Sequence, residues 1–378
     1  MYHVKTMNKI SKIGLAELDD RFEISDTMEH EDAILVRSAK LHDYDFPAEL
    51  LCIARAGAGV NNIPLDRAAE AGIVVFNTPG ANANGVKELT IAALLLASRK
   101  ISQGITWVKE QAAAGADVAA VVEKGKAAYV GPEIQGKTLG VVGLGAIGVL
   151  VANAAAALGM QIVGYDPFLS VQHALNLTPG VKVVSTLEEL YGQADYISLH
   201  LPMTPETKGT LNDAAFAAMK DGVRIVNLAR GELVDTEALK AALASGKCAA
   251  YVTDFPNSET AAMEGVVAIP HLGASTPESE DNCAMMAARQ VRDYLDNGNI
   301  VNSVNLPVLS MAWAAKNRVC VLTKGADAAA IAAAVPAVAS ASKTRGEYGY
   351  FLLDTDAPGD TAAIAALPGV LRVRVLHQ

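Results

Sequence analysis

Three side chains in the second half of the chain have the types needed for proton transfer and for binding a carboxylate. Arg230 follows the apolar run RIVNLA, His271 follows the run VVAIP, and Glu259 lies between them in the sequence. Histidine suits the role of a base that removes a hydroxyl proton, because its unperturbed pKa is near neutrality. Arginine binds a carboxylate through two parallel hydrogen bonds, and a glutamate beside the histidine can orient the ring. The sequence therefore predicts Arg230, Glu259 and His271 as catalytic residues for hydride transfer to or from a small 2-hydroxy acid.

A glycine-rich turn precedes these residues and has the pattern that binds a dinucleotide. The run GLGAIG at 143–148 follows the apolar segment LGVVGL and opens an Ala-rich helix predicted over 146–158. Glycines permit a tight turn and bring backbone N–H groups close to a pyrophosphate at the helix N-terminus. Asp166 ends the next strand, where a carboxylate accepts hydrogen bonds from ribose hydroxyls and repels a 2′-phosphate, so NAD is the expected cofactor. The predicted contacts are Gly143, Gly145, Ala146, Ile147, Gly148 and Asp166.

Parallel sheets are needed to position these residues, and the chain carries two series of short strands that alternate with helices. The first series has strands predicted at 33–38, 50–55 and 72–76. The second series begins at 137, and a long helix is predicted over 277–297. The last seventy residues follow the order β-α-β-β-α-β, which is typical of a ferredoxin-like sandwich. We therefore expect an α/β protein with two doubly wound parallel-sheet domains and a C-terminal ferredoxin-like domain.

Segments around the candidate catalytic residues resemble signature blocks of the D-2-hydroxyacid dehydrogenase family. They are ARGELVDTEAL at 229–239, VTDFPNSE at 252–259 and PHLGASTPES at 270–279, and HLPMTPETKG at 200–209 resembles the family's loop beside the cofactor. The resemblance implies the same catalytic roles for Arg230, Glu259 and His271. It also implies cofactor contacts from His200, Pro202, Thr207, Ala229, Asp254 and Gly273.

The second of these blocks departs from the family pattern. Phe255 follows Asp254 directly, where the family usually has an apolar residue between the aspartate and the phenylalanine. Glu259 retains the family's separation of five from Asp254. We therefore keep Glu259 as the predicted partner of the histidine and expect a different local backbone.

Earlier segments resemble the members of that family that act on 3-phosphoglycerate, namely RSAKL at 37–41, ARAGAGVNNIPLD at 54–66 and NTPGANANGVKE at 77–88. The resemblance implies substrate contacts from Arg37, Ser38, Arg55, Gly57 and Asn82, with Lys126 as a further phosphate contact. The expected reaction is the NAD-dependent oxidation of 3-phospho-D-glycerate to 3-phosphohydroxypyruvate, the first step of serine biosynthesis. Two alternatives stay open: a related dehydrogenase acting on glyoxylate, hydroxypyruvate or D-lactate, and an NAD(H)-sensing binding protein that kept the fold.

The same resemblance implies how the chain divides into domains. A substrate-binding domain is expected at 1–90 and 280–305, an NAD-binding domain at 91–279, and an ACT-like, ligand-binding domain at 306–378. Serine-regulated relatives carry a His-x-Asn-x-Pro-Gly turn after the first strand of the ACT domain, whereas this chain has TKGADA at 323–328. Alanine side chains cannot hydrogen-bond a ligand, so we expect serine to inhibit weakly or not at all.

Composition narrows the range of partners. The 378 residues carry a formal net charge of −10, which argues against a nucleic-acid or anionic-membrane partner. No apolar run reaches membrane-spanning length, and the first ten residues lack the apolar core of a signal peptide. The four cysteines are scattered, as expected for free thiols in the cytoplasm. We expect no metal site, a small anionic substrate, and at least a homodimer, because enzymes of this family pair through their nucleotide-binding domains.

Overall fold

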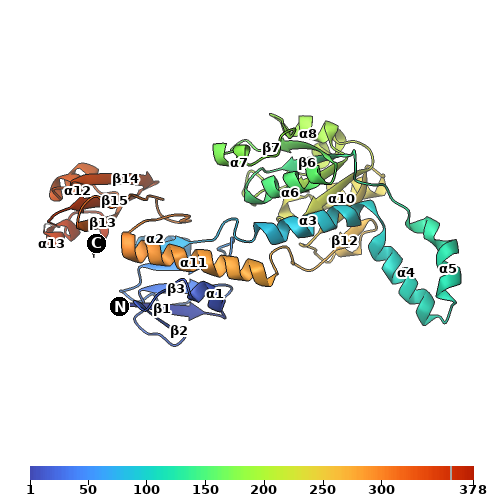
Figure 1. Ribbon diagram of the computed structural model, residues 1–378. Helices are drawn as coiled ribbons and strands as arrows, with labels where there is room; N and C mark the ends of the chain where they lie inside the picture. Colours follow the sequence, from blue (N-terminus) through green and yellow to red (C-terminus); the bar gives the residue numbers. More distant parts are fainter. Residues whose placement is uncertain (358–359) are drawn as a thin grey trace. The chain divides into compact units, whose positions relative to one another are not determined.

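The computed structural model describes residues 1–357 and 360–378, and the chain forms two compact units. Unit 1 comprises Met1–Asn82 and Pro277–Gln378, and unit 2 comprises Ala83–Thr276. The chain therefore leaves unit 1 once and returns to it once, at the first residue of helix α11 (Figure 1).

Unit 2 is built on a parallel sheet with the strand order β12-β11-β10-β9-β6-β7-β8. Strands are added outward in one direction from β6 to β8 and in the other from β9 to β12, so the order reverses between β6 and β9. Dinucleotides bind at such a switch point. The strands are β6 (Thr138–Val142), β7 (Gln161–Tyr165), β8 (Lys182–Val183), β9 (Tyr196–Leu199), β10 (Val223–Asn227), β11 (Cys248–Thr253) and β12 (Val266–Ala268).

Helices of unit 2 connect these strands and cover the sheet. On one side, apolar residues of α3 and α6 pack on the central strands, with Leu94, Leu139 and Val151 in one core. Helices α4 and α5 pack on each other, extend beyond the sheet (Figure 1), and contribute no buried residue. The helices are α3 (Ala83–Ser98), α4 (Ile101–Ala113), α5 (Val118–Gly125), α6 (Ala146–Ala157), α7 (Val171–Leu175), α8 (Leu187–Gln193), α9 (Asp213–Ala218) and α10 (Thr236–Ala244), with 3-10 turns η1 (Lys126–Tyr129), η2 (Gly231–Leu233) and η3 (Thr260–Ala262).

Unit 1 contains a second parallel sheet, with the order β2-β1-β3-β4-β5. The long helix α11 packs on this sheet through buried residues such as Ala287 and Val291, and its first turn carries Glu278 and Glu280 at the positive end of the helix dipole. The elements are β1 (Tyr2–Met7), α1 (Lys12–Leu15), β2 (Phe22–Ser25), β3 (Ala33–Val36), β4 (Cys52–Arg55), α2 (Leu65–Glu70), β5 (Val74–Phe76) and α11 (Pro277–Asn297).

The C-terminal part of unit 1 is an antiparallel sheet with the order β14-β15-β13-β16 and two short helices. Alternate residues of its strands point to opposite faces. One face, including Val319 and Phe351, packs on the two helices, while the other, including Leu322 and Leu352, joins the core formed by α11 and the N-terminal sheet. The elements are β13 (Asn317–Lys324), α12 (Ala328–Ala334), β14 (Ala339–Arg345), β15 (Tyr348–Thr355), α13 (Thr361–Ala365) and β16 (Val370–His377).

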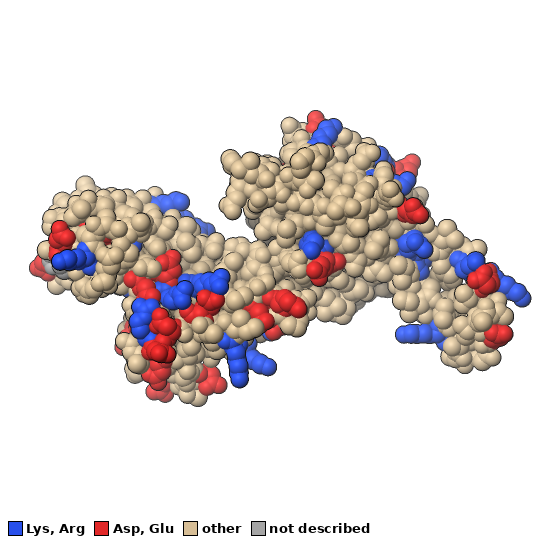
Figure 2. Space-filling view, in the orientation of Figure 1, with Lys and Arg blue, Asp and Glu red and all other residues tan. Residues whose placement is uncertain are grey.

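The fold class predicted from the sequence is confirmed: two parallel α/β sheets and a ferredoxin-like C-terminal sheet. Lys and Arg side chains lie among Asp and Glu side chains on the face drawn in Figure 2 and do not gather in one basic area there. All four cysteines are free and buried. In the part of the chain that the structure describes, no helix is both long and apolar enough to cross a membrane.

Candidate active site

The glycine turn follows β6, and its geometry requires glycine at two positions. Gly143 has φ +94°, and a Cβ there would lie 2.8 Å from the carbonyl oxygen of His200. A Cβ on Gly148 would lie 1.9 Å from the carbonyl oxygen of Gly143. Because of these glycines α6 begins close to the strand, and its N-cap, Gly145, has no side chain to cover the first N–H groups. The turn therefore offers backbone donors and the positive end of a helix to a pyrophosphate.

Two further predicted cofactor contacts, Ala146 and Ile147, are the first residues of α6. Asp166 follows β7 and is fixed beside the turn by backbone donors. Its Oδ2 accepts from the N–H of Leu144 at 2.9 Å, and its Oδ1 accepts from the N–H of Phe168 at 2.8 Å. Each oxygen has another lone pair, so the carboxylate can still accept hydrogen bonds from ribose hydroxyls.

The segment after β9 lies on the other side of the switch point. The N–H of His200 donates to the carbonyl oxygen of Val142, at the end of β6. The His200 Nε2 lies 2.8 Å from Ser198 Oγ, and burial lowers the pKa of His200 to about 4, so the ring is neutral at pH 7. Thr207 Oγ1 donates to the carbonyl oxygen of Pro202 at 2.6 Å. The loop is thus held in place by its own residues.

Arg230 lies just after β10 in a turn organised by the buried side chain of Asn227. The Asn227 Oδ1 accepts from the N–H groups of Ala229 and Arg230, and its Nδ2 donates to the Arg230 carbonyl oxygen at 2.8 Å. The exposed Arg230 guanidinium donates to the Ala229 carbonyl oxygen at 2.6 Å. The arginine is therefore presented at the carboxyl end of a strand, where ligands of open α/β sheets bind.

Asp254 is a buried carboxylate next to His271. Its side chain is 1% exposed, its Oδ2 accepts from the N–H of Gly273 at 2.9 Å, and its Oδ1 has no hydrogen-bond partner among the described residues. Burial raises the pKa of Asp254, while the Gly273 N–H and a protonated His271 oppose the rise. A buried acceptor without a donor is costly. The free oxygen therefore suits a ligand with an N–H group, such as the carboxamide of nicotinamide.

Phe255 brings the predicted base and the predicted cation into one cluster. The ring centroids of His271 and Phe255 are 4.3 Å apart, and the Arg230 Cζ lies 5.4 Å from the Phe255 ring centroid. These three residues follow β12, β11 and β10, respectively. The cluster therefore lies at the carboxyl edge of the sheet that also carries the glycine turn.

Glu259 does not form the contact with His271 that was predicted for it, and it pairs with a lysine instead. Its Oε1 lies 3.3 Å from the Nζ of Lys240 on α10, and 47% of its side chain is exposed. The Asn257 Oδ1 accepts from the N–H groups of Glu259 and Thr260, which starts the turn η3. Over residues 1–357 and 360–378, no hydrogen bond or ion pair joins Glu259 to His271. The structure does not bring these two together, and the orienting role of Glu259 stays a prediction.

In unit 1, the predicted substrate residues gather after β3 and β4. The Arg55 Nε donates to the carbonyl oxygen of Arg37 at 3.1 Å, and the Arg37 Nη2 lies 2.6 Å from Glu280 Oε1. A Cβ on Gly57 would lie 2.0 Å from the Arg55 Nη1, and Gly57 has φ +150°, so glycine makes room for the guanidinium. Two arginines at neighbouring strand ends form a group suited to an anion.

The other predicted substrate residues are more scattered. The N–H of Ser38 donates to Asn8 Oδ1 at 3.0 Å, beside Arg37. Asn82 is the last residue of unit 1 before α3. Lys126 belongs to η1 of unit 2, where its Nζ pairs with Glu123 at 2.5 Å. Ser38 therefore lies beside the arginines, whereas Lys126 is part of unit 2.

Comparison with known proteins shows what part of this chain is similar to. Residues 91–273 match the family described as the D-isomer specific 2-hydroxyacid dehydrogenase, NAD binding domain. This segment of the chain therefore matches an NAD-binding domain of that family, and NAD is the cofactor of the domain. The observed glycine turn, the carboxylate of Asp166 and the unpartnered oxygen of Asp254 fit this cofactor.

Curated relatives carry a more particular name. The chain is 40% identical over 299 residues to D-3-phosphoglycerate dehydrogenase of Mycobacterium leprae, covering 76% of this chain and 53% of the relative. The chain thus spans about half the length of the curated relatives it matches. Among solved structures, it resembles NAD⁺-bound 3-phosphoglycerate dehydrogenase of Entamoeba histolytica, with a TM-score of 0.61, 27% identity and coverage of 82% of this chain and 99% of that one. A glyoxylate reductase from Paecilomyes thermophila gives a TM-score of 0.66 at 28% identity, over 80% and 98% of the two chains.

Sequence reasoning overlooked the residues that support the site. Asn227 does have a sequence signal, because it is the single polar residue inside the apolar run IVNLA. A polar residue in such a run is expected to be buried and hydrogen-bonded. Glu280 is the ion-pair partner of Arg37, but the sequence indicated only that it is an acidic residue near the N-terminus of a helix. The position of Phe255 between two functional side chains has no sequence signal except the departure from the family pattern.

Proposed function

We propose that this chain catalyses the NAD-dependent oxidation of 3-phospho-D-glycerate to 3-phosphohydroxypyruvate. The observation that carries the proposal is the cluster of Arg230, Phe255 and His271 on the same sheet edge as the NAD-binding turn. The names of the curated relatives and the paired arginines Arg37 and Arg55 support a phosphorylated acid as the substrate. The product would enter serine biosynthesis.

Oxidation at C2 of the substrate removes one hydride and one proton. NAD, when bound at the glycine turn and Asp166, would supply the hydride acceptor. The imidazole of His271 takes the hydroxyl proton on a ring nitrogen and becomes an imidazolium, and in the reverse direction it returns that proton. Arg230 holds the substrate carboxylate through its guanidinium and favours charge that develops on the reacting oxygen. Asn227 keeps the turn that presents Arg230 in place.

A steady-state assay tests this proposal. Initial rates are measured with 3-phosphoglycerate, glycerate and D-lactate, using NAD and NADP, and with glyoxylate and hydroxypyruvate in the reductive direction. We expect the highest kcat/KM for 3-phosphoglycerate with NAD. Arg55→Ala should raise KM more for 3-phosphoglycerate than for glycerate. A higher kcat/KM for any of the unphosphorylated substrates would reject the proposed substrate.

The alternatives differ in what such an assay would detect. The structural likeness to a glyoxylate reductase keeps a related dehydrogenase as the second candidate, and glyoxylate or hydroxypyruvate reduction would identify it. An NAD(H)-sensing binding protein would bind NADH and turn over none of these substrates. The grouping of an arginine and a histidine on one aromatic ring favours an enzyme over a sensor.

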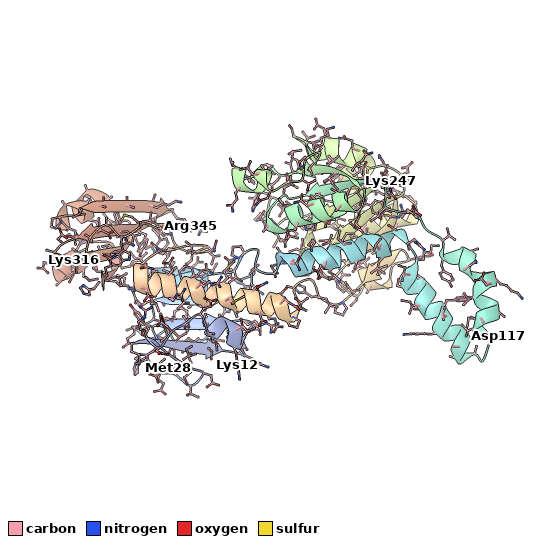
Figure 3. The ribbon with its side chains drawn as sticks, in the orientation of Figure 1. Lys12, Met28, Asp117, Lys247, Lys316 and Arg345 are labelled. Carbon is pink, nitrogen blue, oxygen red and sulfur yellow. The ribbon has the colours of Figure 1, made fainter. Side chains whose placement is uncertain are left out.

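We also propose that the chain forms at least a homodimer through unit 2. Helix α4 exposes Ile101, Ile105 and Val108, with 44%, 52% and 36% of each residue accessible, on an arm that has no buried residue. Asp117, which caps α5, lies at the outer end of this arm (Figure 3). Exposed apolar residues of this kind mark interaction sites. Light scattering should give about twice the chain mass of 39.3 kDa or more, and a single chain mass at micromolar concentration would exclude a dimer.

The finer domain assignments are part of the same proposal. We take the antiparallel sheet of 306–378 as an ACT-like domain and the remaining boundaries as predicted, with 1–90 and 280–305 for the substrate and 91–279 for NAD. The strand order β14-β15-β13-β16 supports the ACT-like assignment. The free, buried state of Cys52, Cys248, Cys283 and Cys320 is compatible with the proposed cytoplasmic location.

A further inference from the structure

Phe255 lies in a turn that is fixed from several sides. Its N–H donates to the Oγ1 of the buried Thr253, the last residue of β11, at 3.0 Å. A Cβ on Gly231 would lie 3.3 Å from the Phe255 carbonyl oxygen, so the turn after Arg230 runs against the Phe255 backbone. The preceding residue, Asp254, is buried and bonded to the N–H of Gly273. The backbone that carries the ring is therefore held in place by the end of β11 and by the neighbouring turns.

The ring makes contact with both groups that the proposed reaction uses. The His271 imidazole lies with its centroid 4.3 Å from the Phe255 centroid, at an interplanar angle of 46°. The Arg230 guanidinium lies within cation–π distance of the same ring, at 5.4 Å. An aromatic face attracts a guanidinium at all times and an imidazolium when the histidine has taken a proton.

Over residues 1–357 and 360–378, the structure gives no hydrogen bond or ion pair between the His271 ring and a carboxylate, although the nearby Asp254 interacts with His271 electrostatically. Glu259 pairs with Lys240, and the Oδ2 of Asp254 is bonded to Gly273. The only hydrogen bond of His271 that the structure gives over the described residues uses its backbone carbonyl, which accepts from Ser275 Oγ. The imidazole ring itself packs against the Phe255 ring.

We infer that Phe255 is a positioning residue that holds the His271 imidazole and the Arg230 guanidinium in the arrangement needed for proton transfer and carboxylate binding. The inference rests on the proposed roles of these two residues. It also assigns a function to the unusual placement of phenylalanine directly after Asp254 in this chain. The ring would stabilise the imidazolium formed during oxidation, and its rigid attachment to β11 would limit rotation of the imidazole.

Substitution of Phe255 by leucine and by tyrosine distinguishes the effect of the aromatic face on catalysis from the effect of side-chain size. Phe255→Leu should lower kcat for 3-phosphoglycerate with NAD by about three- to thirtyfold, the range of a cation–π contact, with the Kd of NADH within twofold of wild type. Phe255→Tyr keeps the aromatic face and should retain kcat within about threefold. The matched control is Phe216→Leu, because Phe216 is buried in the core of unit 2 at α9. It should lower stability and leave kcat unchanged.

A double-mutant cycle with His271→Ala tests whether Phe255 acts through the histidine. If it does, adding Phe255→Leu to His271→Ala should slow kcat by less than about twofold further. Wild-type kcat in Phe255→Leu or an equal loss in Phe255→Tyr would overturn the inference, and the full loss in the His271→Ala background would overturn the part of it that concerns His271. Wild-type kcat in His271→Ala would instead reject the proposed catalytic base. If 3-phosphoglycerate is not turned over, the same variants are compared with glyoxylate and NADH, so that a wrong substrate does not decide the role of Phe255.

Discussion

The sheet edge of unit 2 and the C-terminal sheet of unit 1 each bury an aspartate, and they satisfy it in different ways. Asp354 is fully buried on β15, and both of its oxygens accept from the Arg318 guanidinium, at 2.6 and 2.9 Å, while Oδ2 also accepts from the N–H of Ala314 at 2.7 Å. Asp254 has one bonded oxygen and one without a partner in the described chain. The first aspartate is a complete structural contact, and the second has capacity left for a ligand.

Arg318, the partner of Asp354, also uses all of its side-chain hydrogen-bond donors. The three remaining N–H groups of Arg318 donate to the carbonyl oxygens of Asn297, Met311 and Ala312, at 2.8 to 3.0 Å. Arg318 thereby ties the C-terminal sheet to the end of α11 and to the segment that follows it. Buried polar groups that are fully bonded stabilise one packing arrangement, whereas a buried polar atom without a partner can accept a hydrogen bond from a ligand.

The largest expected effect is on catalysis. His271→Ala should lower kcat by roughly 10²–10⁴, because general acid–base catalysis contributes that factor. The Kd of NADH should be nearly unchanged, since the proposed role of His271 is to act on the substrate. Stopped-flow and steady-state kinetics with 3-phosphoglycerate measure the effect. An unchanged kcat in a folded variant would show that His271 is not the catalytic base, and the sheet edge of unit 2 would then not differ from the C-terminal sheet in the way proposed.

Breaking the complete contact should affect folding instead of chemistry. Arg318→Met leaves Asp354 buried without its partner, which costs about 3–5 kcal/mol in the free energy of unfolding. Urea denaturation measures the loss, and fluorescence titration should show an unchanged Kd for NADH. Lys247→Ala is the control. Lys247, labelled in Figure 3, pairs at 3.0 Å with Asp221, whose side chain is 92% exposed, so its loss should change stability by less than about 1 kcal/mol. Equal losses in the two variants would contradict the structural role of Arg318.

Asp254→Asn should weaken cofactor binding and leave stability intact, which is the opposite of the effects expected for Arg318→Met. Burial raises the pKa of Asp254 in the folded protein, so this group makes the folded state less stable as the pH rises from below the ordinary carboxyl pKa through the raised value. The neutral asparagine lacks this dependence, so the variant without cofactor should be at least as stable as wild type at pH 7. Its Kd for NADH should rise by roughly tenfold, because a charge-assisted hydrogen bond is lost.

Thermal unfolding between pH 3 and 8, with and without NADH, measures both effects of Asp254→Asn. A variant that is clearly less stable than wild type at pH 7 and binds NADH normally would show that Asp254 is a structural residue like Asp354.

The smallest effect is expected at the C-terminal sheet. The turn at Thr323–Ala328 lacks the side chains that hold serine in regulated relatives, and Lys324 is already paired with Glu70 and Glu347, each at 3.5 Å. Millimolar serine should therefore leave the initial rate nearly unchanged, with glycine as the matched control. Near-complete inhibition by micromolar serine would show that other residues build a regulatory site there.

Strong local signals made much of the fold predictable. The helix expected at 277–297 is observed as α11, Pro277–Asn297, because Pro277 and two acidic residues favour its start and glycine follows its end. Helix α12 ends at Ala334, two residues before Pro336, because proline lacks the N–H group that a continuing helix needs. Strands β1 and β2 were missed because their residues are mixed in polarity and mostly half-buried, so neither run has the apolar pattern of an internal strand.

Local sequence signals also made part of the candidate site predictable. Residues that follow apolar strands or sit in the glycine turn could be placed, because strand ends meet at one edge of a parallel sheet. The position of Glu259 could not, since residue counting does not show that Asn257 bonds two following N–H groups and turns the chain toward Lys240. Contacts between side chains from separate strands, such as that of Phe255 with His271, depend on packing that no local pattern encodes.

Isotope transfer from the substrate tests the proposed reaction most directly. 3-Phospho-D-glycerate labelled with deuterium at C2 is incubated with NAD and the enzyme, and the reduced nicotinamide is analysed by mass spectrometry and NMR. The proposed function predicts one deuterium on the nicotinamide ring for each 3-phosphohydroxypyruvate formed. Formation of unlabelled NADH, or no oxidised product from this substrate, would contradict it.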